Sequence, residues 1–243
     1  MPDRQPRLTF VERTGSTNAD LLAALRLAGV AEGDWRIADR QYAGRGRQGR
    51  TWLDAPGNFM GSTAVALSAG DPPPHTLSFV AALAVYEAVL PLIARPDALM
   101  LKWPNDVLLQ GAKFCGLLLE REGNHAVIGI GVNLVAIPAV EGRDVRALAQ
   151  FGPPPPRDDF AKALARRFLV ELAQWRENGV QALLDRWQAA AHQPGAELSV
   201  HDGAGARISG TFAGLAGDGA LKLHLADGTM RVIHAGDVTI GGE

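Results

Sequence analysis

The spacing of hydrophobic positions predicts several helices along the chain. Apolar residues lie three or four positions apart over 19–28, and Gly29 then supplies a natural end to a helix. The stretch 77–93 is apolar almost throughout, yet it is shorter than the ~20 residues of a membrane span and contains Glu87, so it predicts a buried helix. Amphipathic spacing predicts two further packing helices, at 160–175 and, after Gly179, at 180–187.

Stretches rich in β-branched and apolar residues predict strands between these helices. Pro104-Asn105-Asp106 interrupts one apolar run, and Gln110-Gly111 forms the turn of a hairpin. We expect no βαβ unit at the start of the chain. The pattern therefore predicts an α+β domain over residues 1–193, a mostly antiparallel mixed sheet with packing helices. Its strands are expected at 8–11, 35–39, 58–67, 98–102, 107–109, 113–120 and 126–134.

The pattern changes at Pro194, where short alternating strands separated by glycine turns begin. A run of this kind predicts a small β-barrel. We therefore expect a second domain over residues 194–243, with strands at 197–200, 207–212, 220–225, 230–234 and 238–240.

Composition excludes several classes of protein. With 47% hydrophobic and 21% charged residues, the chain is typical of a folded globular protein. A formal net charge of −2 gives no general attraction to nucleic acid or anionic membranes. The single Cys115 excludes an internal disulfide, and the scattered histidines indicate no metal site made by the protein alone. Without a signal-peptide pattern or a membrane span, we expect a cytoplasmic location.

The most unusual stretch is 41–52, because its segment 44–50 alternates glycines with three arginines. Glycine allows close backbone approach, and arginine binds phosphate or carboxylate, so the stretch predicts an anion-binding loop between two strands. Residues 44–49 formally match the dinucleotide fingerprint G-x-G-x-x-G. We reject that interpretation because the following residues 51–58 are turn-like rather than helical.

Four polar segments interrupt the apolar pattern: Ser16-Thr17-Asn18, Gln41 with the loop, Lys102 to Asp106, and Lys113 with Gly116. Several cations around glycines suit a reaction between two anions, such as a carboxylate and a triphosphate, because positive charge lowers the barrier to bringing them together. Each segment also has a simpler explanation. Ser16 and Thr17 are typical of a helix N-cap, and Asn105-Asp106 is typical of a turn.

Taken in order, the motifs resemble those of the biotin protein ligases. They are Gly15 to Asn18, Gln41 to Trp52, Lys102 to Asp106, Lys113 to Gly116, and Gly129 to Asn133. The resemblance implies a class II synthetase-like catalytic domain followed by an SH3-like barrel. It also implies a two-step reaction: biotin and ATP give biotinoyl-AMP and pyrophosphate, and a lysine of a biotin carboxyl carrier domain then takes the biotin. Some relatives carry an N-terminal helix-turn-helix; only residues 1–7 precede the first expected strand, so we expect no DNA binding.

The resemblance assigns roles to particular residues. It implies catalytic roles for Arg45, Arg47, Lys113 and Asp106. Biotin would be bound by Ser16, Thr17, Asn18, Gln41, Gly44, Arg45, Gly46, Arg47, Lys113 and Gly116. ATP or the adenylate would be bound by Arg45, Arg47, Arg50, Trp52, Asn105 and Asn133. Triphosphate chemistry implies Mg²⁺, with no protein metal cluster. A monomer and a homodimer are both compatible with the sequence.

Two alternatives remain open from the sequence. A lipoate-type ligase shares the catalytic fold, but its arginine-glycine loop differs from the one seen here. A nucleic-acid-binding module would use the arginines for phosphates and the barrel for single strands. The near-neutral net charge and the 6% aromatic content weigh against the second alternative.

Overall fold

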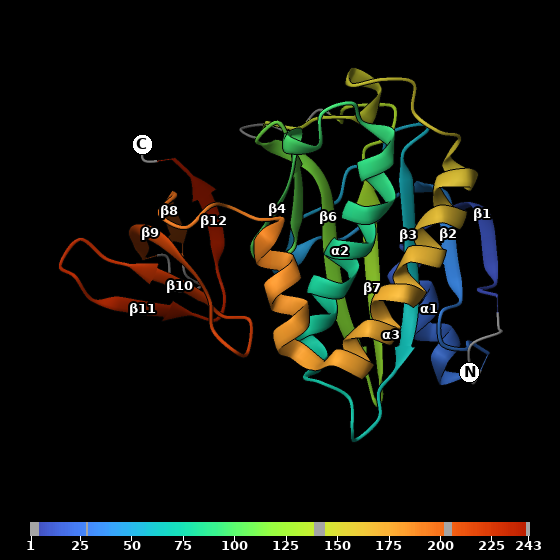
Figure 1. The fold of residues 1–243 in the computed structure, drawn as a ribbon. Helices are drawn as coiled ribbons and strands as arrows, with labels where there is room; N and C mark the ends of the chain where they lie inside the picture. Colours follow the sequence, from blue (N-terminus) through green and yellow to red (C-terminus); the bar gives the residue numbers. More distant parts are fainter. Residues whose placement is uncertain (1–4, 28, 139–143, 202–205, 242–243) are drawn as a thin grey trace.

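The computed structural model describes residues 5–27, 29–138, 144–201 and 206–241, which form two β-sheets with packing helices (Figure 1). The larger sheet has seven strands in the order β1-β2-β3-β7-β6-β5-β4. Neighbours in this sheet are antiparallel except β1 and β2. Its strands are β1 (Leu8–Thr14), β2 (Trp35–Gln41), β3 (Phe59–Ala66), β4 (Leu99–Lys102), β5 (Asp106–Leu109), β6 (Ala112–Glu122) and β7 (His125–Val132).

The expectation that no βαβ unit opens the chain is wrong. Helix α1 (Thr17–Arg26) connects the parallel strands β1 and β2, as a parallel pair requires a crossover. The strand β1 continues three residues beyond the predicted 8–11, and all of its residues are partly or fully exposed. The sequence pattern missed this extension because an exposed edge strand carries no apolar alternation.

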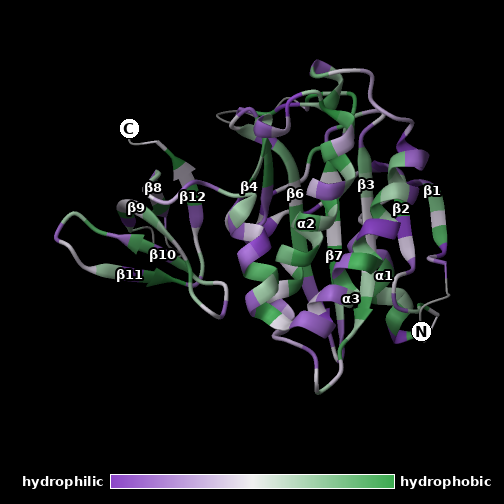
Figure 2. Cartoon of the chain, in the orientation of Figure 1, coloured by the Kyte–Doolittle hydropathy of each residue, from purple (hydrophilic) through white to green (hydrophobic). Residues whose placement is uncertain are grey.

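Helices α2 (Leu77–Val89) and α3 (Arg157–Ala189) cover one face of the large sheet, and α1 lies on the other (Figure 1). The α-helix of the predicted buried segment ends at Val89, and a 3-10 turn containing Pro91 follows. The range Pro74–Leu92 is apolar enough for a membrane span, but 61% of its most apolar window is buried inside the protein. Helix α3 bends at Gly179 (φ 74°, ψ −174°), which accounts for the two helices predicted there. Its residues alternate between hydrophilic and hydrophobic (Figure 2).

Strand periodicity leaves a strip without side chains on the α1 face of the sheet. In β7, Ile128, Ile130 and Val132 belong to the main core, so Gly129 and Gly131 face the opposite side. Register places Gly131 beside Gly116 of β6. The glycines therefore leave room above the middle of the sheet for groups from other elements.

The smaller sheet is antiparallel, in the order β11-β10-β9-β8-β12. It shares the main hydrophobic core with the larger sheet, and the Trp103 Nε1–H donates a 3.0 Å hydrogen bond to the carbonyl oxygen of Gly219. The domain division at residues 193/194 and closure of this sheet into a barrel stay predictions. Its strands are β8 (Glu197–His201), β9 (Arg207–Leu215), β10 (Leu221–His224), β11 (Met230–Ile233) and β12 (Asp237–Ile240).

His192 makes the junction between the sheets sensitive to pH. Its side chain is 4% exposed and lies edge-on to Phe212, with ring centroids 6.1 Å apart. Burial, helped by the charge of Lys102, lowers the pKa of His192 from 6.5 to about 4. The unfolded chain therefore binds a proton on this ring below about pH 6.5, while the folded chain resists protonation until about pH 4.

Stability should accordingly fall as the pH drops from 6.5 toward 4. Between pH 7 and pH 5 we expect His192 to account for about 2 kcal/mol of lost unfolding free energy. Urea unfolding of the wild type and of His192→Gln at the two pH values measures this share. The variant should lose less stability on acidification, and an equal loss in both proteins would contradict the prediction.

Candidate active site

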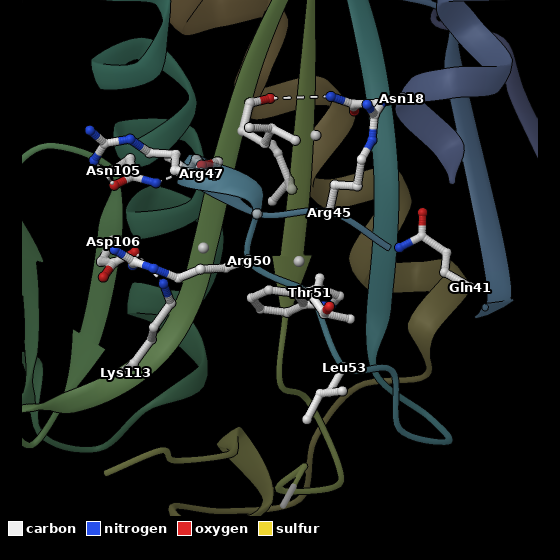
Figure 3. A pocket seen from close by; sticks show the side chains of 18 of the residues that line it. Asn18, Gln41, Arg45, Arg47, Arg50, Thr51, Leu53, Asn105, Asp106 and Lys113 are labelled. Carbon is white, nitrogen blue, oxygen red and sulfur yellow. Dashed lines mark hydrogen bonds and ion pairs between the residues drawn. The ribbon is translucent and has the colours of Figure 1, made fainter. Parts of the chain in front are cut away.

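A pocket opens above the glycine strip, between α1, the arginine-glycine loop, β6 and the start of β12. Figure 3 shows the charged side chains gathered around it. It is lined by Ser16, Thr17, Asn18, Gln41, Arg45, Gly46, Arg47, Arg50, Thr51, Trp52, Leu53, Gly61, Asn105, Asp106, Lys113, Gly116, Leu117, Leu118, Gly129, Ile130, Gly131, Asn133, Pro138, Val145 and Asp237.

The N-terminus of α1 forms a buried polar wall of this pocket. Ser16 occupies the N-cap position as predicted, but its side chain makes no capping hydrogen bond. Gln41 caps the helix instead, since its Oε1 accepts a 2.7 Å hydrogen bond from the Thr17 backbone N–H. The hydroxyls of Thr17 and Ser62 lie 2.6 Å apart.

Asn18 lies on the sheet where Gly129 leaves space. A Cβ at Gly129 would be 2.4 Å from the Asn18 Oδ1, so any larger residue would displace the amide. The Ser62 hydroxyl donates to the Asn18 Oδ1 at 2.5 Å, and the Asn18 Nδ2 donates to the Glu120 Oε2 at 2.8 Å. The amide is thus held at both ends.

The arginine-glycine loop follows β2 and is folded on itself. The Gly46 N–H donates to the Arg50 carbonyl at 2.7 Å, and the Trp52 N–H donates to the Gly44 carbonyl at 2.9 Å. A Cβ at Gly44 would lie 2.9 Å from the carbonyl oxygen of Trp52, so glycine is needed where the two arms meet. The turn presents its arginines to the pocket.

Each loop arginine has a different partner. The Arg47 Nη1 donates to the Asn105 Oδ1 at 2.9 Å, and burial lowers the pKa of Arg47 while the charge of Asp106 partly opposes that shift. Arg45 forms a 3.2 Å ion pair with Glu120. Arg50 forms an ion pair with Asp237, which brings the smaller sheet to the pocket.

Lys113 reaches the same space because of a bulge in β6. The register with β5 shifts between Val107 and Leu108. Phe114 and Cys115, consecutive residues, are both buried in the core. The extra residue puts Lys113 on the same face of the sheet as Gly116. A Cβ at Gly116 would lie 3.2 Å from the Lys113 Nζ. The Nζ is 2.5 Å from the Asp106 Oδ1, which orients the ammonium group (Figure 3).

Trp52 occupies the glycine strip beside Lys113. A Cβ at Gly131 would be 2.3 Å from the Trp52 indole, and one at Gly116 would be 2.9 Å from it. The ring therefore lies close against the backbone of β6 and β7. Such a ring can stack with a planar ligand that enters above it.

Asn133 is almost fully buried at the wall of the pocket. Its side chain is 1% exposed; its Oδ1 accepts from the Asn58 Nδ2 at 3.2 Å and its Nδ2 donates to the Arg146 carbonyl at 3.2 Å. These partners give Asn133 a part in fixing the pocket wall.

The structure gathers all predicted site residues at the pocket wall except Gly44, which lies behind it at the base of the loop. Three contributors were missed: Ser62, Glu120 and Asp237. Glu120 could have been found from strand alternation, since it lies on the face of Gly116 and Leu118. Ser62 is a polar residue in a buried strand, and Asp237 carried no local signal.

Comparison with known proteins decides the family. The model of the biotin/lipoate A/B protein ligase family matches residues 10–133, and that of the biotin protein ligase C-terminal domain matches residues 202–241. The biotin--[acetyl-CoA-carboxylase] ligase of Paracoccus denitrificans is 40% identical over 96% of this chain and 100% of that protein. This chain belongs to the biotin protein ligase family. The resemblance predicted from the motifs is confirmed.

Other members of the biotin protein ligase family extend the likeness. The bifunctional ligase/repressor BirA of Escherichia coli is 32% identical over 93% of this chain, which covers 71% of BirA. A solved biotin protein ligase from Aquifex aeolicus, in complex with biotin and ATP, superposes with a TM-score of 0.84 at 25% identity, over 98% of this chain and 99% of that one. The predicted α+β fold is confirmed as well.

Proposed function

We propose that this family member is an ATP-dependent biotin protein ligase. It would join biotin to ATP, releasing pyrophosphate, and transfer the biotinoyl group to a lysine of a biotin carboxyl carrier domain such as that of acetyl-CoA carboxylase. The observation that carries the proposal is the pocket itself, in which Arg45, Arg47 and Lys113 lie beside a buried wall of neutral hydrogen-bonding groups. The names of the relatives mention biotin and ATP, which fit a pocket with one neutral and one positively charged end.

The neutral wall suits the ureido ring of biotin. The buried Thr17 and Asn18 and the half-buried Gln41 offer donors and acceptors. Each unpaired polar group is costly in such a setting, so a ring with matching N–H and carbonyl groups is favoured. The apolar lining from Leu118 suits the valeryl chain. The carboxylate would then lie under the arginines.

The charged end suits formation of the adenylate. A carboxylate oxygen of biotin attacks the α-phosphorus of ATP, and the bond to pyrophosphate breaks. Arg45, Arg47 and Lys113 would stabilise the negative charge that develops on the phosphate oxygens. In the second step the carrier amine attacks the biotinoyl carbonyl, loses a proton and releases AMP. Asp106 would hold the metal ion or the incoming amine.

Nucleotide binding would use the other side of the pocket. Trp52 would stack on the adenylate, while Asn105, Arg50 and Asn133 would complete its surroundings. No group of three or more metal-ligating residues occurs in the described part of the chain. Mg²⁺ would enter as an ion carried by the triphosphate, because Mg²⁺ usually takes one or two carboxylates plus phosphates. The pocket offers the carboxylates of Asp106 and Asp237, which pair with Lys113 and Arg50. The ion would shield the phosphate charge.

The remaining assignments stay predictions. They are the cytoplasmic location, the absence of DNA binding and the choice between monomer and homodimer. We propose no repressor role.

The activity is tested with purified protein, ATP, Mg²⁺ and a carrier domain. We expect biotin-dependent pyrophosphate release and biotin on the carrier lysine, detected by mass spectrometry. Lipoate and octanoate serve as matched carboxylic acids. Activation of either acid, with none of biotin, would overturn the proposal in favour of the lipoate-type alternative.

A further inference from the structure

Glu120 lies where α1, the loop and β6 meet, just outside the pocket wall. Its side chain is 24% exposed. One oxygen accepts from the Asn18 Nδ2 at 2.8 Å, and the other pairs with the Arg45 Nη2 at 3.2 Å. In Figure 3 the Arg45 side chain extends toward Asn18. One carboxylate thus serves both the neutral and the charged parts of the site.

The Asn18 Nδ2 faces two acceptors, the Glu120 carboxylate at 2.8 Å and the Leu118 carbonyl at 3.4 Å, and the shorter contact, with Glu120, fixes which way the amide faces. An ionised carboxylate only accepts hydrogen bonds, so the Asn18 Nδ2 must point to Glu120. The Asn18 Oδ1 is then the acceptor for the hydroxyl of Ser62, at 2.5 Å. The opposite orientation would place two oxygens against each other and leave the NH₂ group facing a hydroxyl.

The orientation of the Asn18 amide also determines which hydroxyl donates in the contact between Ser62 and Thr17. Ser62 has one hydroxyl proton and gives it to Asn18, so the 2.6 Å contact between Ser62 and Thr17 requires Thr17 to donate. The Gln41 Oε1 lies 3.1 Å from the Thr17 hydroxyl and 2.7 Å from the Thr17 backbone nitrogen; with the hydroxyl proton given to Ser62, Gln41 takes its hydrogen bond from the backbone N–H. The Thr17 oxygen keeps a lone pair, and it lines the pocket as an acceptor.

We propose that Glu120 is a positioning residue that sets the donor and acceptor pattern presented to biotin. It acts through Asn18 and Ser62, and it leaves the Thr17 oxygen ready to accept a ureido N–H. The inference rests on the proposed function for the identity of the ligand. The orientation of Asn18 does not depend on any ligand.

A matched control lies two residues further along the same face of β6. Glu122 also joins β6 to α1, through a 2.9 Å ion pair with Arg26, but it lies away from the pocket. Glu122→Ala therefore removes an equivalent contact between helix and strand without touching Asn18. Glu120→Gln keeps an oxygen that can accept from Asn18.

Calorimetric titration with biotin, without ATP, measures the effect on the wild type and the variants. We expect Glu120→Ala to weaken biotin binding by about 10- to 100-fold, the worth of a hydrogen bond to a charged group. Glu120→Gln should stay within about 5-fold of the wild type, and Glu122→Ala within about 2-fold. In steady-state assays of Glu120→Ala the KM for biotin should rise, while the KM for ATP should change less than about 2-fold. Once Asn18 is alanine, adding Glu120→Ala should cost little more.

A ligand-free measurement separates this inference from the proposed function. The side-chain amide protons of Asn18, followed by NMR, should exchange slowly with water in the wild type and in Glu122→Ala, and fast in Glu120→Ala. A wild type that binds no biotin would refute the proposed function alone. Unchanged exchange in Glu120→Ala would overturn the inference, as would equal loss of biotin binding in Glu120→Ala and Glu122→Ala, or in Glu120→Ala and Glu120→Gln.

Discussion

Replacement of Lys113 by alanine is expected to slow biotin-dependent pyrophosphate release by about 10²- to 10³-fold, the usual cost of removing one charge-stabilising donor. The ammonium group lies 2.5 Å from Asp106 and is held at the pocket by the bulge in β6. It is therefore oriented before the substrates arrive, which is where a fixed charge contributes most. Single-turnover release of pyrophosphate at saturating biotin and ATP measures the step.

Two further variants test whether the loss of rate is caused by removing the positive charge at position 113. Lys113→Arg keeps a cation and should lose less activity than Lys113→Ala. Lys162→Ala removes an exposed lysine of α3 whose partner is Asp159, and its rate should equal that of the wild type. A rate for Lys113→Ala close to that of Lys162→Ala would make Lys113 an ordinary surface lysine.

The second large effect is expected from the substitution Gly131→Ala, which adds a single methyl group and should weaken ATP binding. Its Cβ would lie 2.3 Å from the Trp52 indole, and Gly131 is held in the middle of the sheet between β3 and β6. The ring has to move because the backbone cannot. Since base stacking on an aromatic ring is worth about 1–3 kcal/mol, we expect the KM for ATP to rise by about 10- to 100-fold in Gly131→Ala.

A double variant tests whether the effect passes through Trp52. Gly131→Ala should add little once Trp52 is alanine, because the displaced ring is already gone. Gly70→Ala is the control, since no atom lies within 4 Å of a Cβ at Gly70. Full additivity of the Gly131 and Trp52 effects would mean that the glycine acts on the nucleotide by another route.

The neutral and charged parts of the site differ in how far the sequence could predict them. The loop arginines and Lys113 were selected because charge next to glycine is unusual within an apolar sheet. Ser62 and Glu120 were not selected, because a serine in a strand and a glutamate near a strand end are ordinary features by themselves. Their roles depend on Asn18, which comes from a helix more than forty residues away in the chain.

Local patterns alone determined most of the fold. Helical spacing identified α2 and the two halves of α3, and alternation identified the strands, because each reflects which side chains face the core. The motifs and their order also determined the family. The same patterns failed for the parallel pairing of β1 with β2, since pairing depends on the path of the whole chain.

Tertiary structure decided how the motifs become one site. The bulge that turns Lys113 toward the pocket, the glycine strip that admits Trp52 and Asn18, and the approach of Asp237 all arise from registers between strands distant in sequence. Periodicity shows which face a residue takes within its own strand, but register between strands depends on packing summed over the entire sheet. The sequence by itself therefore predicted which polar and charged groups belong to the site, and only the folded sheet set their positions and the direction of their hydrogen bonds.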